Sequence, residues 1–314
     1  MAHQINSMMY AGAAPWHGLG TKVEGILSVA EVIKAAGLDW TVGKFKVFTE
    51  DGVAVPGVHA VRRSDTMEVI GTVGDRYSFV QNESAFIPFQ GFADQGLVSF
   101  ETAGALGVGE RVWILAKINR PNSVIVPQAD DSVAKYMLLS NSHDGSMSVR
   151  VGFTPIRVVC NNTLRLAHAD GASKLIRINH RGNMESKLEA LTETINVVDQ
   201  SFEATADKYR ALASKGINSA DLENLVKIVF SQRESDSKKK SPVLEKIIPL
   251  FEHGRGNDLP GVRGTLWAAY NAITEYIQYE RGDDANRRLD STWFGTGQQL
   301  NARALDAALE LIKA

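Results

Sequence analysis

Arginine, asparagine and histidine recur at helical spacing in the segment 154–170, which reads TPIRVVCNNTLRLAHAD. A helix that begins at Pro155, with Thr154 as its N-cap, places four polar residues on one face: Arg157, Asn161, Arg165 and His168. Guanidinium groups bind phosphate or carboxylate through paired, charge-assisted hydrogen bonds. The spacing therefore predicts an anion-binding face. The alternative is a solvated helix face whose arginines pair with acids elsewhere in the fold.

The surrounding stretch is the one basic segment of the sequence. The whole chain of 314 residues carries 34 Lys and Arg against 36 Asp and Glu, a net charge of -2. No basic field covers the whole protein, so affinity for nucleic acid has to come from a local patch. The residues predicted to contact phosphates are Arg150, Arg157, Asn161, Arg165, Lys174, Arg177 and Arg181.

A second set of reactive side chains consists of His143, Asp144 and Cys160. A histidine base with an orienting carboxylate and a thiol nucleophile would suit a hydrolase. The alternative is structural: the sequence around His143 and Asp144 is typical of a turn, and Cys160 falls on the apolar stripe of the predicted helix. We therefore expect no catalytic residue and keep these three as candidates.

No metal or cofactor site is expected. The single cysteine excludes a paired-cysteine zinc site, and the histidines show no pair at i and i+4. The sequence GLGTK at 18–22 reverses the order of a phosphate-binding loop, and the glycines at 104–109 do not open a helix.

The N-terminal part of the chain is predicted to form a mostly antiparallel sheet with short helices. Residues 40–50 alternate as a half-buried strand, and two further strand candidates at 52–63 and 67–80 complete a meander. Residues 82–96 predict a short helix that Pro88 kinks or divides. Strand–turn–strand patterns follow at 98–118 and 135–153.

From residue 184 onward the pattern becomes helical. A long amphipathic helix is predicted at 185–216, with a second at 219–230 that Ser219 caps, and further helices at 241–254, 264–282 and 300–314. A polar linker lies near 231–242. The predicted fold is α+β, with a core domain at 1–183 and a helical region at 184–314.

The sequence also predicts a cytoplasmic protein. One cysteine allows no disulfide within the chain, which favours a reducing compartment. The N-terminus lacks the pattern of a signal peptide, and no apolar run approaches the roughly 20 residues that span a bilayer. We expect no membrane partner.

Several ordered motifs together resemble the phage/plasmid-like protein family, a domain of unknown function (932). They are WHGLGT (16–21), VGDRYSFVQNESAF (73–86), ETAGALGVGERVWILAK (101–117), NSHDGSMS (141–148) and TPIRVVCNNTL (154–164), with LWAAYNAITEY and STWFGTG near the end. The resemblance implies a protein of a mobile element and brings no firm activity. The strand–strand–strand–helix order at 41–95 is also similar to the core of phage single-strand annealing proteins.

Three functions from different classes follow. The first is a non-enzymatic protein that binds single-stranded DNA, an oligomer-forming annealing or recombination accessory protein of a phage or plasmid. The second is an inhibitor of host defence that binds a host protein through an aromatic surface at Trp267, Tyr270, Tyr276 and Tyr279. The third is a hydrolase that uses His143, Asp144 or Cys160.

Overall fold

The computed structural model describes residues 5–12, 20–25, 27–147, 149–157, 162–163, 176–177, 202–231, 241–282, 288, 291–292 and 295–313. The chain forms two compact units from alternating segments. The first unit takes Met1–Arg120, Tyr136–Phe153 and Lys174–Ile195, and the second takes Pro121–Lys135, Thr154–Ser173 and Asn196–Ala314. The predicted boundary at 183–184 lies outside the described residues and stays a prediction.

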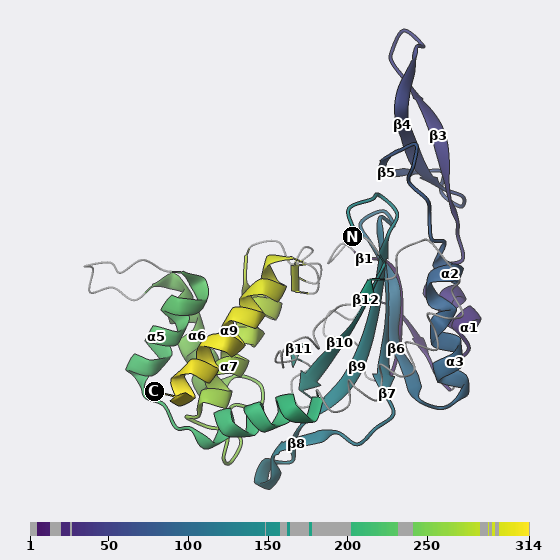
Figure 1. The fold of residues 1–314 in the computed structure, drawn as a ribbon. Coiled ribbons are helices and arrows are strands. Elements are labelled where there is room, and N and C mark those ends of the chain that lie inside the picture. The colour runs from purple at the N-terminus through teal and green to yellow at the C-terminus, as the bar shows by residue number, and fades with distance from the viewer. Residues whose placement is uncertain are drawn as a thin grey trace. The chain divides into compact units, whose positions relative to one another are not determined.

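The predicted α+β class is confirmed, with antiparallel strands in the N-terminal half and helices mostly in the C-terminal half (Figure 1). The larger sheet has the order β11-β10-β9-β7-β6-β1-β2, with β8 and β12 paired to β9 and β10. Its strands are β1 (Ile5–Ala11), β2 (Thr21–Val23), β6 (Val98–Leu106), β7 (Arg111–Ile118), β8 (Ser123–Val126), β9 (Asp131–Ser142), β10 (Arg150–Arg157), β11 (Asn162–Thr163) and β12 (Ile176–Arg177). A 3₁₀ turn, η2 (Pro127–Ala129), joins β8 to β9. Both predicted strand–turn–strand patterns are confirmed.

The centre of this sheet in the first unit requires a residue without a side chain at Gly104 of β6. A Cβ atom there would lie 2.5 Å from the Trp113 ring and 2.7 Å from the Met8 Cβ, and it would overlap the Ser7 carbonyl oxygen. The close approach of β1 to β6 therefore depends on glycine at this position.

Replacing Gly104 by alanine is expected to lower the free energy of unfolding by about 1–3 kcal/mol, because the added methyl group overpacks the interior. Urea denaturation measures the change. Gly91→Ala is the matched control: it lies in α3 with nothing within 4 Å of its added Cβ, so it should be neutral or stabilise by up to about 1 kcal/mol. Equal stabilities of the two variants would contradict the packing argument.

A smaller antiparallel sheet of three strands belongs to the first unit. Its strands are β3 (Val42–Phe48), β4 (Ala54–Arg63) and β5 (Val69–Gly74), in that order. The predicted meander is confirmed, and Figure 1 shows it projecting from the end of the unit near α2. Strand alternation buries Val61 and Val73 on one face and leaves the other open.

Three short helices accompany the sheets of the first unit: α1 (Val29–Ala35), α2 (Asn82–Phe86) and α3 (Pro88–Asp94). Ser28 and Glu31 form a capping box that starts α1. The helix predicted at 82–96 is divided at Pro88, as expected, because proline fits the first turn of a new helix and not the interior of an old one. Helices α1 and α3 pack against β6.

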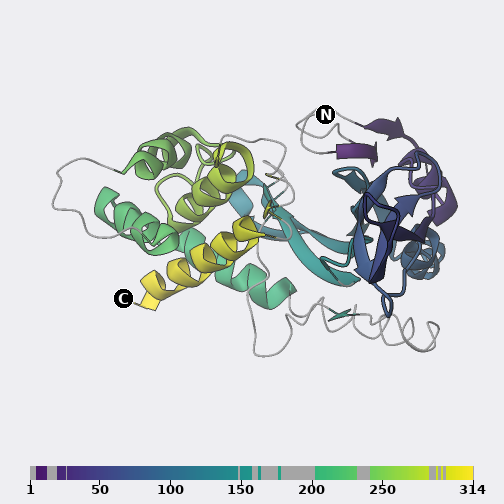
Figure 2. The ribbon, with the colours of Figure 1, turned by 90° about the horizontal axis from the view of Figure 1, so that it is seen from above.

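The second unit is built around helix α7 (Leu266–Glu275), all ten residues of which are buried. Residues 202–214 are helical, and α5 (Ser219–Phe230), α6 (Pro242–His253) and α9 (Thr296–Lys313) follow in the chain. A π-helical turn, η3 (Tyr276–Glu280), continues α7. Helix α7 packs on α6 and α9, and α9 packs on α5 (Figure 2). The cap of α5 is Asn218 and not the predicted Ser219, because Asn218 accepts from the Ala220 and Asp221 amides.

The helix predicted to begin at Pro155 is wrong at its start. Residues up to Arg157 continue β10, and β11 pairs with it antiparallel, placing Asn162 opposite Arg157. One local effect favours the strand: Thr154 and Ile156, which flank Pro155, are β-branched. The rest of the predicted helix, 158–161 and 164–170, lies outside the described residues.

Candidate nucleic-acid interface

The structure places two of the predicted phosphate contacts directly opposite each other. In the first unit, β10 and β12 pair antiparallel with Arg150 opposite Arg177 and Val151 opposite Ile176. Directly opposed residues of an antiparallel pair belong to the same face of the sheet. The sequence had separated these two arginines by 27 positions, so the register is what brings them together.

The other predicted contacts are not brought to this pair. Arg157 belongs to the second unit, where it is opposite Asn162 of β11 and not Asn161. Arg157 is therefore part of a strand and does not belong to the helical face predicted for Arg157, Asn161 and Arg165. The remaining candidates lie outside the described residues: Cys160, Asn161, Arg165, His168, Lys174 and Arg181.

The candidate base His143 is fully enclosed in the first unit. Its side chain is 1% exposed, its Nε2 lies 2.8 Å from Asn82 Oδ1, and its ring meets the edge of Trp40 with centroids 5.3 Å apart. Asp144 Oδ1 accepts a hydrogen bond from the Ser146 amide at 2.9 Å, which closes the turn. The arrangement favours the structural alternative, in which these residues fix the turn between β9 and β10.

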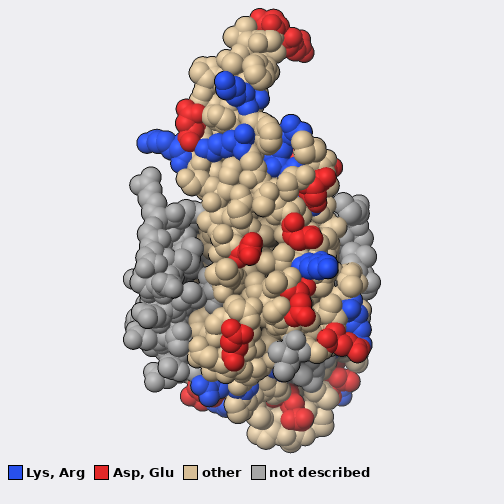
Figure 3. Space-filling model, turned by 90° about the vertical axis from the view of Figure 1, so that its right-hand side faces the viewer, with Lys and Arg blue, Asp and Glu red and all other residues tan. Residues whose placement is uncertain are grey.

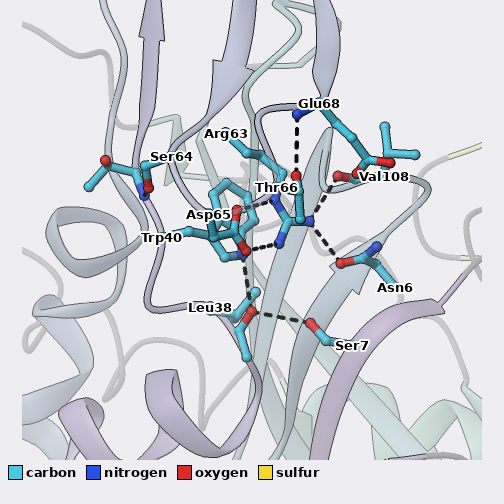
Figure 4. Close-up of polar contacts among 12 residues, drawn as sticks. Asn6, Ser7, Leu38, Trp40, Arg63, Ser64, Asp65, Thr66, Glu68 and Val108 are labelled. Carbon is cyan, nitrogen blue, oxygen red and sulfur yellow. Dashed lines mark hydrogen bonds and ion pairs between the residues drawn. The ribbon is translucent and has the colours of Figure 1, made fainter.

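The sequence analysis did not identify Arg63, a buried arginine that connects the small sheet to other strands of the first unit (Figure 4). Arg63 is 4% exposed and forms two hydrogen bonds with Asp65, at 2.9 and 2.7 Å. Its Nη1 donates to Asn6 Oδ1 at 2.8 Å and to the Val108 carbonyl at 2.9 Å. The guanidinium carbon lies 4.2 Å from the centre of the Trp40 ring. These contacts join β1, β4 and the β6–β7 turn.

The neighbouring Arg62 points to the opposite face of β4, because successive strand residues alternate. Its guanidinium carbon lies 4.6 Å from the centre of the Phe45 ring, and Phe45 is 41% exposed. The strand at 40–50 was predicted correctly, but its pattern gave no sign that Phe45 faces outward. Figure 3 shows Lys and Arg side chains gathered around the base of the projecting sheet, with acidic side chains at its tip.

The aromatic surface predicted for a host-protein partner is wrong for three of its four residues. Trp267 and Tyr270 are 0% exposed and Tyr276 is 6% exposed. They form the interior of the second unit, where the Trp267 and Tyr209 rings lie 4.9 Å apart. Apolar residues lie on nearly all sides of α7, which explains the burial, and its buried Asn271 and Thr274 donate to carbonyls of the same helix.

Among the described residues, no three His, Cys, Asp or Glu side chains gather so that they could hold a metal ion. In the same part of the chain, no helix has both the length and the apolar character that a bilayer crossing requires.

The fold is that of an α+β protein whose larger sheet places Arg150 opposite Arg177. The chain belongs to the family described as Domain of unknown function (DUF932), whose model matches residues 69–305. The resemblance drawn from the sequence motifs to this domain is confirmed. The matched range begins in β5, so β3 and β4 precede it. No curated protein and no solved structure matches the chain.

Proposed function

We propose that the protein binds single-stranded nucleic acid and has no catalytic role. It acts in the cytoplasm of a bacterial host as a single-strand annealing or recombination accessory protein of a phage or plasmid, and it forms oligomers. The observation that carries this proposal is the opposed pair of Arg150 and Arg177.

Two positive charges at directly opposed positions destabilise a sheet unless a negative charge offsets their repulsion. A phosphate group is suited to this role because it accepts hydrogen bonds from two guanidinium groups at once. The pair also belongs to the one basic segment of a chain whose net charge is -2. Binding at a local cationic site, and not through a general field, agrees with this charge distribution.

The order of strands and helices supports single-stranded nucleic acid as the ligand. Strands β3, β4 and β5 are followed directly by α2 and α3, the strand–strand–strand–helix order that resembles phage annealing proteins.

The test is fluorescence anisotropy with a labelled oligonucleotide over a series of salt concentrations. We expect wild-type affinity to fall with salt, and the double variant Arg150→Gln, Arg177→Gln to reduce the slope by about 0.7, because the pair holds one phosphate and each phosphate contact contributes roughly 0.7 for single strands.

A double variant with the same loss of charge, Lys34→Gln and Lys227→Gln, is the control. These lysines lie in the last turns of α1 and α5, away from the β10–β12 pair in sequence, and the control should keep the wild-type slope. Binding that ignores salt, or a slope that both double variants reduce equally, would count against the proposal. Capture of one host protein that survives nuclease treatment would favour the inhibitor instead.

A further inference from the structure

Exposed apolar side chains are concentrated on the small sheet of the first unit. In the described part of the chain nine large apolar side chains are exposed, and five of them belong to this sheet and its turns, within residues 42–74: Phe45, Phe48, Val53, Met67 and Val69. Single exposed apolar residues are normal on a protein surface, whereas a concentration of this kind marks a place where another molecule binds.

The sheet packs on its own unit through its inner face. Gly71 lies opposite Val61 on that face, and a Cβ atom at Gly71 would lie 2.7 Å from the Asp144 Cβ, so the face rests on the turn between β9 and β10. Phe45 and Arg62 lie on the outer face, with the guanidinium carbon 4.6 Å from the centre of the ring. Phe45 is still 41% exposed beside this cation. The outer face is therefore the one that is open to a partner.

The open edge of the sheet is less suited to association than its outer face. Strand β3 is an edge strand and carries Lys44 and Lys46. Lysine on an edge strand opposes pairing with a strand of another chain. Both lysines alternate with Phe45, and Lys44 lies opposite Val61, so they belong to the inner side of the sheet. A partner is therefore expected on the outer face and not along the edge.

Charge is ordered along the length of this sheet. Residues 42–74 have no net charge, because they carry four basic and four acidic residues: Lys44, Lys46, Arg62, Arg63, Glu50, Asp51, Asp65 and Glu68. Glu50 and Asp51 lie in the turn at the tip, so the rest of the sheet has an excess of two positive charges. Figure 3 shows both groups from one side, with the basic side chains at the base and the acidic ones at the tip. Zero net charge gives a polyanion no advantage, whereas this order is complementary to the same surface turned end for end.

We infer that the outer face of β3–β5 is the contact surface of a two-fold dimer of this protein, in which the small sheets of two copies lie face to face and run in opposite directions. In a two-fold dimer the same patch contacts itself, so the patch has to be self-complementary. A partner of another kind would need a matching order of charges, whereas a second copy has it. This inference rests on the part of the proposed function by which the protein forms oligomers.

The strand register fixes which residues meet. Arg62 lies opposite Gly43 near the base of the sheet. When Arg62 is aligned with Glu50 of a second copy, the two-fold axis passes between positions 46 and 47 of β3. Position 45 of one copy then meets position 48 of the other, so the exposed rings of Phe45 and Phe48 lie at the centre of the contact. An apolar centre with charged pairs at both ends is the usual composition of an interface.

The test is analytical ultracentrifugation of the full chain over a range of concentrations, in which wild type should sediment as a dimer that dissociates on dilution. Arg62→Glu and Glu50→Arg each place like charges together at two symmetric positions, so each should weaken the dimer on the order of tenfold. The double variant Arg62→Glu, Glu50→Arg exchanges the charges and should restore the wild-type dissociation constant. Single variants that dimerise as wild type does, or a double variant that does not recover, would overturn the alignment.

Phe48→Asp should be monomeric at the same concentrations, because it buries a charge at the centre of the contact. Ile228→Asp is the matched control, since Ile228 is 46% exposed on α5 of the second unit, and it should remain dimeric. If wild type and Phe48→Asp are both dimers, the surface is overturned and the proposed function stands. A wild type that is monomeric at every concentration overturns the inference. A dimer that Phe48→Asp dissociates, but that binds no oligonucleotide, supports this surface and contradicts the proposed function.

Discussion

Replacing Arg63 by alanine is expected to lower the free energy of unfolding by about 2–4 kcal/mol. The substitution removes both hydrogen bonds to Asp65, leaves the Asn6 amide oxygen and the Val108 carbonyl without this donor, and uncovers the face of Trp40. The loss exceeds that of an ordinary surface ion pair because Arg63 is only 4% exposed and its removal also leaves a cavity against the Trp40 ring.

Urea denaturation measures the loss, and hydrogen exchange locates it. Protection should fall in β1, β4 and the β6–β7 turn, the three segments that Arg63 joins. Arg62→Ala is the matched control from the adjacent position and should cost less than about 1 kcal/mol, because its side chain lies on the open face. Arg63→Lys should restore only part of the loss, since a point charge cannot form the paired bonds and the flat stack together. A loss from Arg63→Ala no larger than that from Arg62→Ala would refute the assignment.

The same cluster has a predictable pH dependence. The hydrogen bonds from Arg63 lower the pKa of the Asp65 carboxyl below its ordinary value. A carboxyl with a lowered folded-state pKa stabilises the protein above its unfolded pKa of about 3.9, and this contribution disappears as the pH falls through the folded value. The stability difference between wild type and Asp65→Asn should therefore be present at neutral pH and shrink in acid.

Replacing Trp267 by phenylalanine is expected to lower the free energy of unfolding by about 2–4 kcal/mol. The indole Nε1 donates to Asp131 Oδ2 at 2.9 Å, and both residues are 0% exposed. The smaller ring loses this hydrogen bond to an acidic group and leaves a cavity beside Tyr209 and Tyr270. Both effects act in the same direction.

Thermal and urea unfolding report the loss, and hydrogen exchange should show it in α7 and at the start of β9. Ile228→Ala, at an exposed position of the same unit, should change stability by no more than about 0.5 kcal/mol. If Trp267→Phe cost no more than this control, the bond to Asp131 would contribute nothing to stability.

Local patterns predicted most elements of the fold. The alternation in β3, the division of a helix at Pro88 and the apolar spacing of α5 are properties of neighbouring residues, so the sequence alone reveals them. The segment after Thr154 shows the limit of this reasoning: its apolar residues fit a helical stripe, but its β-branched residues fit a strand equally well. Pairing with β11 decides between them, and no local pattern contains that information.

Contacts between distant residues could not be predicted. Arg62 and Arg63 are adjacent and of the same type, and only the partners of Arg63 show which of the two is buried. Asn6 lies 57 positions from Arg63, and Asp131 lies 136 positions from Trp267. For the candidate site, the sequence identified the basic segment, whereas the opposition of Arg150 to Arg177 and the stack of Arg62 on Phe45 both depend on strand register.

Each unit is built from three separate segments of the chain, which limits the recombination between related genes that preserves the fold. Strand β9 begins with residues of one unit and ends with residues of the other, and the chain returns to each unit again after residue 153. One crossover between two related genes therefore cannot exchange one unit and leave the other intact. A crossover between residues 131 and 267 would take Asp131 from one parent and Trp267 from the other, so this contact would be inherited from two lineages. Viable hybrids should be rare unless both parents have matching residues at such contacts.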